Sequence, residues 1–245
     1  MPMDRQAVNP FREEMLKEEE RVTYRKSMDA FFERLVELNI DIYLLEQLLA
    51  FPYDLLADGW TDNGFFFQLM IKNTFEASVL LIANMTTDQG SDVLTLPRFK
   101  NRLRQMVQTA QQTAFQEYLK SIYFDQKSRA LLEKVRNLRD TRIAHFIPAA
   151  SHEFLTLSEI KMVRDDLNAL LQALSFDVDY IMLPFSYESG QSDVEWALDA
   201  IAKSSPLLTM PEQDPERWLH RRSTFTESET AQLNHYRKKF GWTEI

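Results

Sequence analysis

The amino-acid sequence predicts an all-α protein, and two observations carry that prediction. Only five glycines occur in 245 residues, far below the usual share of about 7%. Neither glycine nor proline interrupts the stretches from Pro10 to Pro52, from Pro97 to Pro148, or from Pro148 to Pro184. Such long unbroken stretches favour helices, because a sheet needs frequent turns. We therefore expect a helical bundle of four to six main helices.

The composition indicates a globular protein, with 44% apolar and 27% charged residues. There are no cysteines, which excludes disulfides, thiolate metal sites and cysteine nucleophiles, and we expect a cytoplasmic location. No stretch reaches the roughly 20 consecutive apolar residues of a membrane span, and the amino terminus is charged rather than a signal peptide, so no membrane partner is expected. The net charge of −9 argues against a protein that simply coats nucleic acid.

A first helix is expected to begin at Asn9-Pro10, where an N-cap residue precedes proline at the first helical position. Apolar residues then recur every seven positions in two matched rows, the a/d pattern of a coiled coil. The rows are Met28, Leu35, Ile42 and Leu49, and Phe31, Leu38 and Leu45. We interpret them as packing within a bundle, with a dimerising coiled coil as the alternative.

A second helix is expected over residues 63–86. Phe66, Leu69 and Leu80 lie on one broad face of it, while Phe67 and Ile71 fall elsewhere. A helix that is apolar on most sides belongs at the centre of a bundle, so we expect this one to be buried there.

The remaining helices follow capping residues and breaks. They are expected near residues 95–104, 110–123, 125–145 and 156–174, the last opened by a capping box at Thr156 and Glu159. Beyond Tyr180, four prolines interrupt the chain. Short helices are expected there near 191–203 and, after a second capping box at Thr226, near 227–240. We therefore expect a helical domain at 1–180 and an irregular, partly helical C-terminal appendage at 181–245.

Polar residues project onto the buried stripe of the helix expected at 125–145. At about 100° per residue, three apolar side chains form that stripe: Leu131, Val135 and Leu138. Arg142 and His145 project into the same stripe, Arg139 lies at its edge, and Asp140 falls on the face expected to meet water. A buried guanidinium must be hydrogen-bonded, because its charge cannot be neutralised. The pattern indicates a polar cleft, a subunit interface or a substrate site, or alternatively an arginine–carboxylate pair inside the bundle with His145 at the helix end.

Two segments are basic although the chain is acidic. Residues 127–142 hold six lysines and arginines against two acidic residues, a net charge of +4. A second basic stretch contains Arg98, Lys100, Arg102 and Arg104. We interpret this second stretch as a solvated helix face, with an RNA track as the alternative.

The segment Asn137-Leu-Arg-Asp-Thr-Arg-Ile-Ala-His-Phe146 resembles the signature of the HEPN superfamily (higher eukaryotes and prokaryotes nucleotide-binding). RNase members of that superfamily carry an arginine, usually followed by a polar residue, and a histidine after about four to six residues. Here five residues separate Arg139 from His145, and Asp140 fills the polar position. This local sequence most resembles that of the branch known from phage abortive-infection proteins. Residues 73–88 resemble the central helix of that branch, and the resemblance covers about residues 25–175.

The resemblance implies a bundle of four or five helices, often dimeric, in which the arginine and histidine of two protomers meet at a shared cleft. It implies catalytic roles for Arg139, which would hold the scissile phosphate, and His145, which would transfer protons with an ordinary pKa near about 6.5. Asp140 would position Arg139, and Arg142 would bind an adjacent phosphate. On a straight helix Arg139 and His145 sit about 120° apart, a misalignment that a dimer resolves.

We therefore expect a metal-independent endoribonuclease of the HEPN type with a phage-defence or toxin-like role. No cofactor is expected, and no metal site, because metal-binding histidine motifs are absent from the sequence. The expected partners are RNA, a second copy of the chain, and an antitoxin or regulatory protein. The alternative is a non-catalytic helical module that binds RNA, nucleotide or a partner protein through the same cleft.

Overall fold

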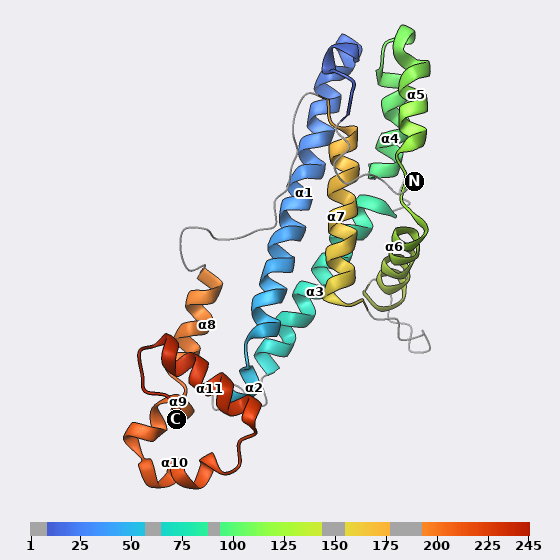
Figure 1. The fold of residues 1–245 in the computed structure, drawn as a ribbon. Helices are drawn as coiled ribbons and strands as arrows, with labels where there is room; N and C mark the ends of the chain where they lie inside the picture. Colours follow the sequence, from blue (N-terminus) through green and yellow to red (C-terminus); the bar gives the residue numbers. More distant parts are fainter. Residues whose placement is uncertain (1–8, 57–64, 88–93, 144–154, 177–192) are drawn as a thin grey trace. The chain divides into compact units, whose positions relative to one another are not determined.

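The computed structural model describes residues 9–56, 65–87, 94–143, 155–176 and 193–245. Within these segments all regular secondary structure is helical, and the extended pairing is limited to an isolated bridge between Leu16 and Val107. The all-α prediction is confirmed. The main helices up to residue 176 are α1 (Glu18–Ala50), α3 (Phe65–Thr86), α4 (Leu96–Met106), α5 (Gln112–Ser121), α6 (Gln126–Leu138) and α7 (Leu157–Leu174) (Figure 1).

The chain divides into two compact units. Unit 1 comprises Met1–Tyr43 and Phe75–Phe185, and unit 2 comprises Leu44–Thr74 and Ser186–Ile245. Both α1 and α3 contribute residues to each unit. Unit 2 therefore holds more than the C-terminal region, because it also takes a segment from the first third of the chain.

The heptad rows of α1 form much of the core of unit 1. Six of their members are at most 2% exposed, and five of these six belong to unit 1: Met28, Phe31, Leu35, Leu38 and Ile42. They pack in one cluster with apolar residues of α3, α4, α5, α6 and α7, such as Phe99 and Leu167. These rows therefore pack against helices of their own chain, as in a bundle. Leu49 departs from the pattern, because its side chain is 53% exposed.

The start of α1 differs from the prediction. The helix begins at Glu18, and Asn9 does not cap it; the Oδ1 atom of Asn9 instead accepts a hydrogen bond from the backbone N–H of Phe11 at 2.9 Å. A short 3₁₀ turn, η1 (Glu13–Met15), follows. Asparagine serves in both turns and helix caps, so the local sequence alone did not distinguish the two.

The first turns of α3 are more exposed than predicted. Phe65, Phe66 and Leu69 are 65%, 49% and 41% exposed, so a place at the centre of a bundle is wrong for this part of the helix. By length and composition, α3 is also a helix that could cross a membrane, and 28% of its most apolar window is buried. These two properties alone are weak evidence for a membrane span. Further along, Val79, Ile82 and other residues join the core of unit 1.

The C-terminal region is more regular than the predicted appendage. It forms α8 (Asp193–Lys203), α9 (Pro206–Gln213), α10 (Pro215–Arg222) and α11 (Glu227–Lys239). The predicted helices near 191–203 and 227–240 correspond to α8 and α11, and the capping box at Thr226 is present. The helices α9 and α10 were missed, because their prolines were interpreted as breaks. Pro206 and Pro215 instead occupy the first turns, where proline costs no helical hydrogen bond.

Unit 2 has its own apolar core, built from both parts of its sequence. Residues 48–67 supply Leu48, Phe51, Leu55, Leu56 and Phe67, and the C-terminal helices supply Leu198, Ala202, Leu207, Leu208, Met210, Trp218 and Leu233. The short helix α2 (Tyr53–Leu56) lies in the first group. Neither group can complete this core alone.

A buried arginine of unit 2 donates hydrogen bonds to several segments of the C-terminal region. The side chain of Arg237 on α11 is 1% exposed. Its Nη1 donates to the carbonyl oxygen of Leu208, its Nε donates to that of Thr243 at 2.6 Å, and its guanidinium pairs with Glu212. The guanidinium also lies 5.9 Å from the ring centroid of Trp242. A charge this deeply buried is tolerated only with such partners.

Candidate functional site

Two of the predicted site residues, Arg139 and Asp140, directly follow the C-terminal end of α6. Asp125 caps its start by accepting a hydrogen bond from the backbone N–H of Ser128 at 2.7 Å. The hydroxyl group of Ser128 also contacts Asp166 of α7 at 2.5 Å, and Lys134 pairs with Glu159 at 3.0 Å. Because later residues of α6 meet earlier residues of α7, the two helices run antiparallel. The end of α6 is therefore directed toward the start of α7.

Hydrogen bonds hold the carboxylates at the two helix starts in their charged form. The pKa of Asp125 is lowered, first by the backbone hydrogen bond from Ser128. The pKa of Glu159 is lowered, first by the backbone hydrogen bond from Thr156 and further by Lys134. Thr156 and Glu159 form the predicted capping box at the start of α7. At neutral pH the charged Asp125 thus caps α6, and the charged Glu159 caps α7 and pairs with Lys134 of α6.

The α-helix ends at Leu138, and the chain continues as a π-helix, η4 (Arg139–Ile143). Leu131, Val135 and Leu138 are buried, as the predicted stripe requires. A π-helix adds a residue to each turn, so an angular projection based on an α-helix does not extend past Leu138. Segments of this kind occur often at functional sites. The site motif thus begins at the point where the helix widens.

Arg139 and Asp140 are in direct contact. The Nε and Nη2 atoms of Arg139 lie 2.8 and 2.7 Å from Oδ1 of Asp140. The other oxygen, Oδ2, lies 3.8 Å from Nε of Arg136. Arg139 is 18% exposed and Asp140 42% exposed, so the carboxylate reaches water while also holding the guanidinium. Asp140 therefore lies between two arginines, and this group of three has a net charge of +1.

The other two predicted site residues cannot be placed with these. The backbone of Arg142 belongs to the π-helix, but its side chain lies outside the described part of the chain, as does the whole of His145. The structure therefore brings together Arg139 and Asp140. The proximity of His145 to Arg139 stays a prediction.

A buried arginine of α7 was not anticipated from the sequence. Arg164 is 8% exposed, donates from Nε to Asp165 at 2.7 Å, and donates from Nη1 to Oδ1 of buried Asn39 on α1. Its position among Ile160, Val163 and Leu167 was the available signal. Its contacts link α7 to α1 within the core of unit 1, so we assign it a structural role.

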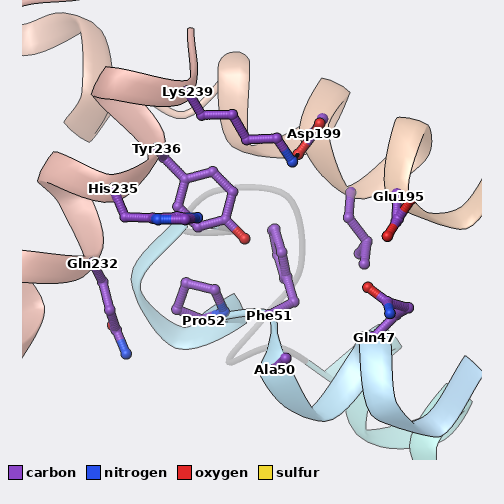
Figure 2. A pocket seen from close by; sticks show the side chains of 11 residues that line it. Gln47, Ala50, Phe51, Pro52, Glu195, Asp199, Gln232, His235, Tyr236 and Lys239 are labelled. Atoms are coloured by element: carbon purple, nitrogen blue, oxygen red, sulfur yellow. Dashed lines mark hydrogen bonds and ion pairs between the residues drawn. The ribbon is translucent and has the colours of Figure 1, made fainter. Parts of the chain in front are cut away.

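Unit 2 contains a pocket that sequence reasoning also missed. Its volume is about 270 Å³, and it lies between the end of α1, α8 and α11 (Figure 2). Phe51 and Tyr236 form an apolar wall, with ring centroids 6.1 Å apart and nearly perpendicular planes. Across from them, Nζ of Lys239 lies 2.6 Å from Asp199 of α8. The lining residues come from two segments that are more than 140 positions apart in the sequence, so local sequence patterns could not predict the pocket.

The polar groups that line this pocket can donate and accept hydrogen bonds. Burial, followed by the nearby charge of Asp199, raises the pKa of Tyr236 to about 12, so its hydroxyl stays protonated at neutral pH. The charge of Lys239 is balanced by Asp199. The remaining polar lining consists of Gln47, Gln232, Glu195 and His235. These groups offer hydrogen bonds to a small polar ligand. Throughout the described segments, this pocket included, no three His, Cys, Asp or Glu residues gather in a way that could hold a metal ion.

Comparison with known proteins places the chain in one family. A family model described as HEPN AbiU2 matches residues 22–194, which is more than half of the chain and includes the whole Arg139–His145 segment. The match confirms the resemblance to the abortive-infection branch of HEPN proteins. It ends in the first turn of α8, so the α11 side of the unit 2 pocket lies beyond it. No match was found among curated proteins or among solved structures.

Proposed function

This chain belongs to the HEPN AbiU2 family, and from that premise we propose that it is a metal-independent endoribonuclease with a phage-defence or toxin-like role. Arg139 and His145 are the proposed catalytic residues, in a cleft shared by two protomers. The observation that carries the proposal is the position of Arg139. Its guanidinium is partly exposed at the first residue of a π-helix and is oriented by Asp140.

The proposed reaction is attack by a ribose 2′-oxygen on the adjacent phosphorus. The bond from phosphorus to the 5′-oxygen breaks, leaving a 2′,3′-cyclic phosphate and a 5′-hydroxyl. A neutral His145 accepts the 2′-hydroxyl proton, and a protonated His145, supplied by the second protomer, donates a proton to the leaving 5′-oxygen. Arg139 binds the non-bridging oxygens, where negative charge grows in the transition state. Arg142 binds a neighbouring phosphate.

The alternative function is a non-catalytic module that binds RNA, nucleotide or a protein, and one observation favours the protein partner among these. The guanidinium of Arg139 already has a carboxylate partner, Asp140, at hydrogen-bonding distance. A phosphate must share or displace that partner, which weakens its binding. In the catalytic proposal this same contact sets the orientation of Arg139 and is loosened by substrate.

The test is cleavage of a mixed RNA pool by the full chain in excess EDTA. Wild type is compared with Arg139→Ala, His145→Ala and the control Arg129→Ala, which removes an exposed arginine on another turn of α6. We expect cleavage by wild type and the control, and a loss of at least about 100-fold in the other two. Far-UV circular dichroism checks that each variant folds.

Three other outcomes would contradict the proposal. Equal cleavage by all four proteins would indicate a contaminating nuclease. Activity abolished by EDTA in wild type would indicate a metal-dependent reaction. No cleavage by wild type, with RNA still bound in an Arg139-dependent way, would favour the binding module.

A further inference from the structure

The surface of α4 is basic, although the chain as a whole is acidic. From residue 94 to residue 116 the sequence holds four basic residues and no aspartate or glutamate, against a net charge of −9 for the whole chain. Five side chains of α4 are exposed, and all are cationic or amide-bearing: Arg98, Asn101, Arg102, Arg104 and Gln105. In the part of the chain that the structure describes, no carboxylate pairs with Arg102 or Arg104.

The opposite side of α4 anchors it firmly. Leu96, Phe99, Leu103 and Met106 are at most 1% exposed, and the ring of Phe99 stacks on Tyr24 with centroids 6.1 Å apart. Lys100 takes no part in the exposed surface, because its Nζ donates to the carbonyl oxygen of Ile122 and burial lowers its pKa. The exposed arginines therefore project from a rigid helix.

Neutral hydrogen-bonding groups extend this surface beyond α4. Thr109 in the turn η3 (Thr109–Gln111) and Thr113 in α5, which contacts α4, are exposed. Gln108, just before η3, is also exposed, and its side-chain amide donates to the carbonyl oxygen of Glu14. Arginines bind phosphates, and amide and hydroxyl groups bind sugar and base edges. The surface ends near residues 14–20, where exposed glutamates approach the last turn of α4 through the hydrogen bond from Lys17 to Met106.

From these features we propose that the α4 surface, defined by Arg98, Asn101, Arg102, Arg104 and Gln105, binds the phosphate backbone of RNA. An anionic membrane fits less well, because a helix that binds a membrane surface inserts exposed apolar residues, and the apolar residues of α4 are all buried. The proposal deepens the proposed ribonuclease function and rests on it for the identity of the nucleic acid.

The α4 surface and the Arg139 segment lie toward opposite ends of α7. Tyr118 of α5 donates to the carbonyl oxygen of Ala173 at 2.8 Å, and Tyr24, which stacks on Phe99, donates to that of Leu174 at 3.3 Å. These contacts place α4 and α5 at the C-terminal end of α7, whereas α6 is directed toward its start. A helix of 18 residues is about 27 Å long. At about 3.4 Å per stacked nucleotide, an RNA that contacts both regions spans about eight nucleotides.

The first test measures binding of a fluorescent 20-nucleotide RNA to full-length protein in EDTA, with His145→Ala as the parent to prevent cleavage. The double variant Arg102→Gln/Arg104→Gln is expected to bind about tenfold more weakly and to lower the slope of log K against log salt by about 1.4. The matched control is Arg217→Gln/Arg222→Gln, which changes the same charge at exposed positions of unit 2. Equal weakening by both doubles, or by neither, would overturn the proposal.

The second test separates the α4 surface from catalysis. In proteins with His145 intact, Arg102→Gln/Arg104→Gln is expected to raise KM for the 20-nucleotide RNA about tenfold, leave kcat unchanged, and leave cleavage of a four-nucleotide RNA unchanged. Normal long-RNA kinetics in this double would overturn the α4 proposal and leave the ribonuclease proposal standing. If instead the wild-type protein bound RNA without cleaving it, and only the α4 double lost that binding, the α4 proposal would stand and the ribonuclease proposal would be overturned. If the double instead abolished binding to phosphatidylserine vesicles and left RNA binding intact, the partner would be a membrane and the proposal overturned.

Discussion

Replacing Arg237 with methionine should destabilise unit 2 by about 2–6 kcal/mol. The side chain is 1% exposed, and methionine fills a similar space without the donors. The carbonyl oxygen of Leu208, a fully buried residue, would lose the hydrogen bond from Arg237, which costs about 1–3 kcal/mol. The hydrogen bond to Thr243 and the contact with Trp242 add about 1–3 kcal/mol. The loss of Glu212 adds little, because that carboxylate is 56% exposed and returns to water.

The tryptophans supply an assay specific to this unit. All four, Trp60, Trp196, Trp218 and Trp242, fall within the bounds of unit 2. Urea unfolding followed by tryptophan fluorescence therefore reports on unit 2, whereas circular dichroism reports on both units. We expect the fluorescence midpoint to fall sharply in Arg237→Met. In the control Arg217→Met, which replaces an exposed arginine, the free energy of unfolding should change by less than about 0.5 kcal/mol.

A pH series provides a second readout for the same variant. Arg237 lowers the pKa of Glu212 from its ordinary value of 4.5, mainly through a hydrogen bond. A lowered native pKa gives stability that is present above pH 4.5 and is lost as the pH falls through the native value. On acidification, wild type should therefore lose a small contribution to stability that the variant already lacks, small because the Glu212 carboxylate is 56% exposed. A fluorescence midpoint that does not move in Arg237→Met, with an unchanged m-value, would refute the reasoning.

Three further predictions concern other parts of the chain. Burial, followed by the charge of Glu37, raises the pKa of Asp41 to about 6, so its contribution to stability falls as the pH rises from about 4 to 6. In thermal melts Asp41→Asn should flatten that fall and should add about 1 kcal/mol to the stability at pH 7.5, after allowance for the half-exposed position of Asp41. Thr156→Ala should cost about 1 kcal/mol in urea unfolding by removing the acceptor for the backbone N–H of Glu159, while Thr156→Ser should cost much less. Deleting residues 186–245 should lower soluble yield and increase binding of a hydrophobic dye, because the deletion removes most of the core of unit 2; a soluble, dye-silent product would contradict this.

Local hydrogen bonding made several helix starts predictable from sequence. The capping boxes at Thr156 and Thr226 marked the starts of α7 and α11, because a cap involves residues only three positions apart. Proline was ambiguous, because whether it begins a helix or ends one depends on packing with residues far away in the sequence. At Pro206 and Pro215 it begins a helix, and only the packing of unit 2 shows that these segments are helical.

The candidate site was only partly predictable. The motif located Arg139 and anticipated its contact with Asp140, since the two are adjacent in the sequence. The π-helix was not foreseeable, because periodicity arguments assume a uniform turn. Buried Arg164 and Arg237 were missed because arginine is usually exposed, and their partners lie 125 and 29 positions away.

The composition of unit 2 from two distant segments has a consequence during synthesis. The apolar residues of 48–67 leave the ribosome long before Leu233, and at about 5–20 residues per second the delay is roughly 10–30 s. Throughout that interval Phe51, Leu56 and Phe67 lack the partners that will cover them. The nascent chain thus exposes an aggregation-prone apolar segment for much longer than a domain built from contiguous sequence would. A chaperone that binds this segment would therefore raise the yield of folded protein.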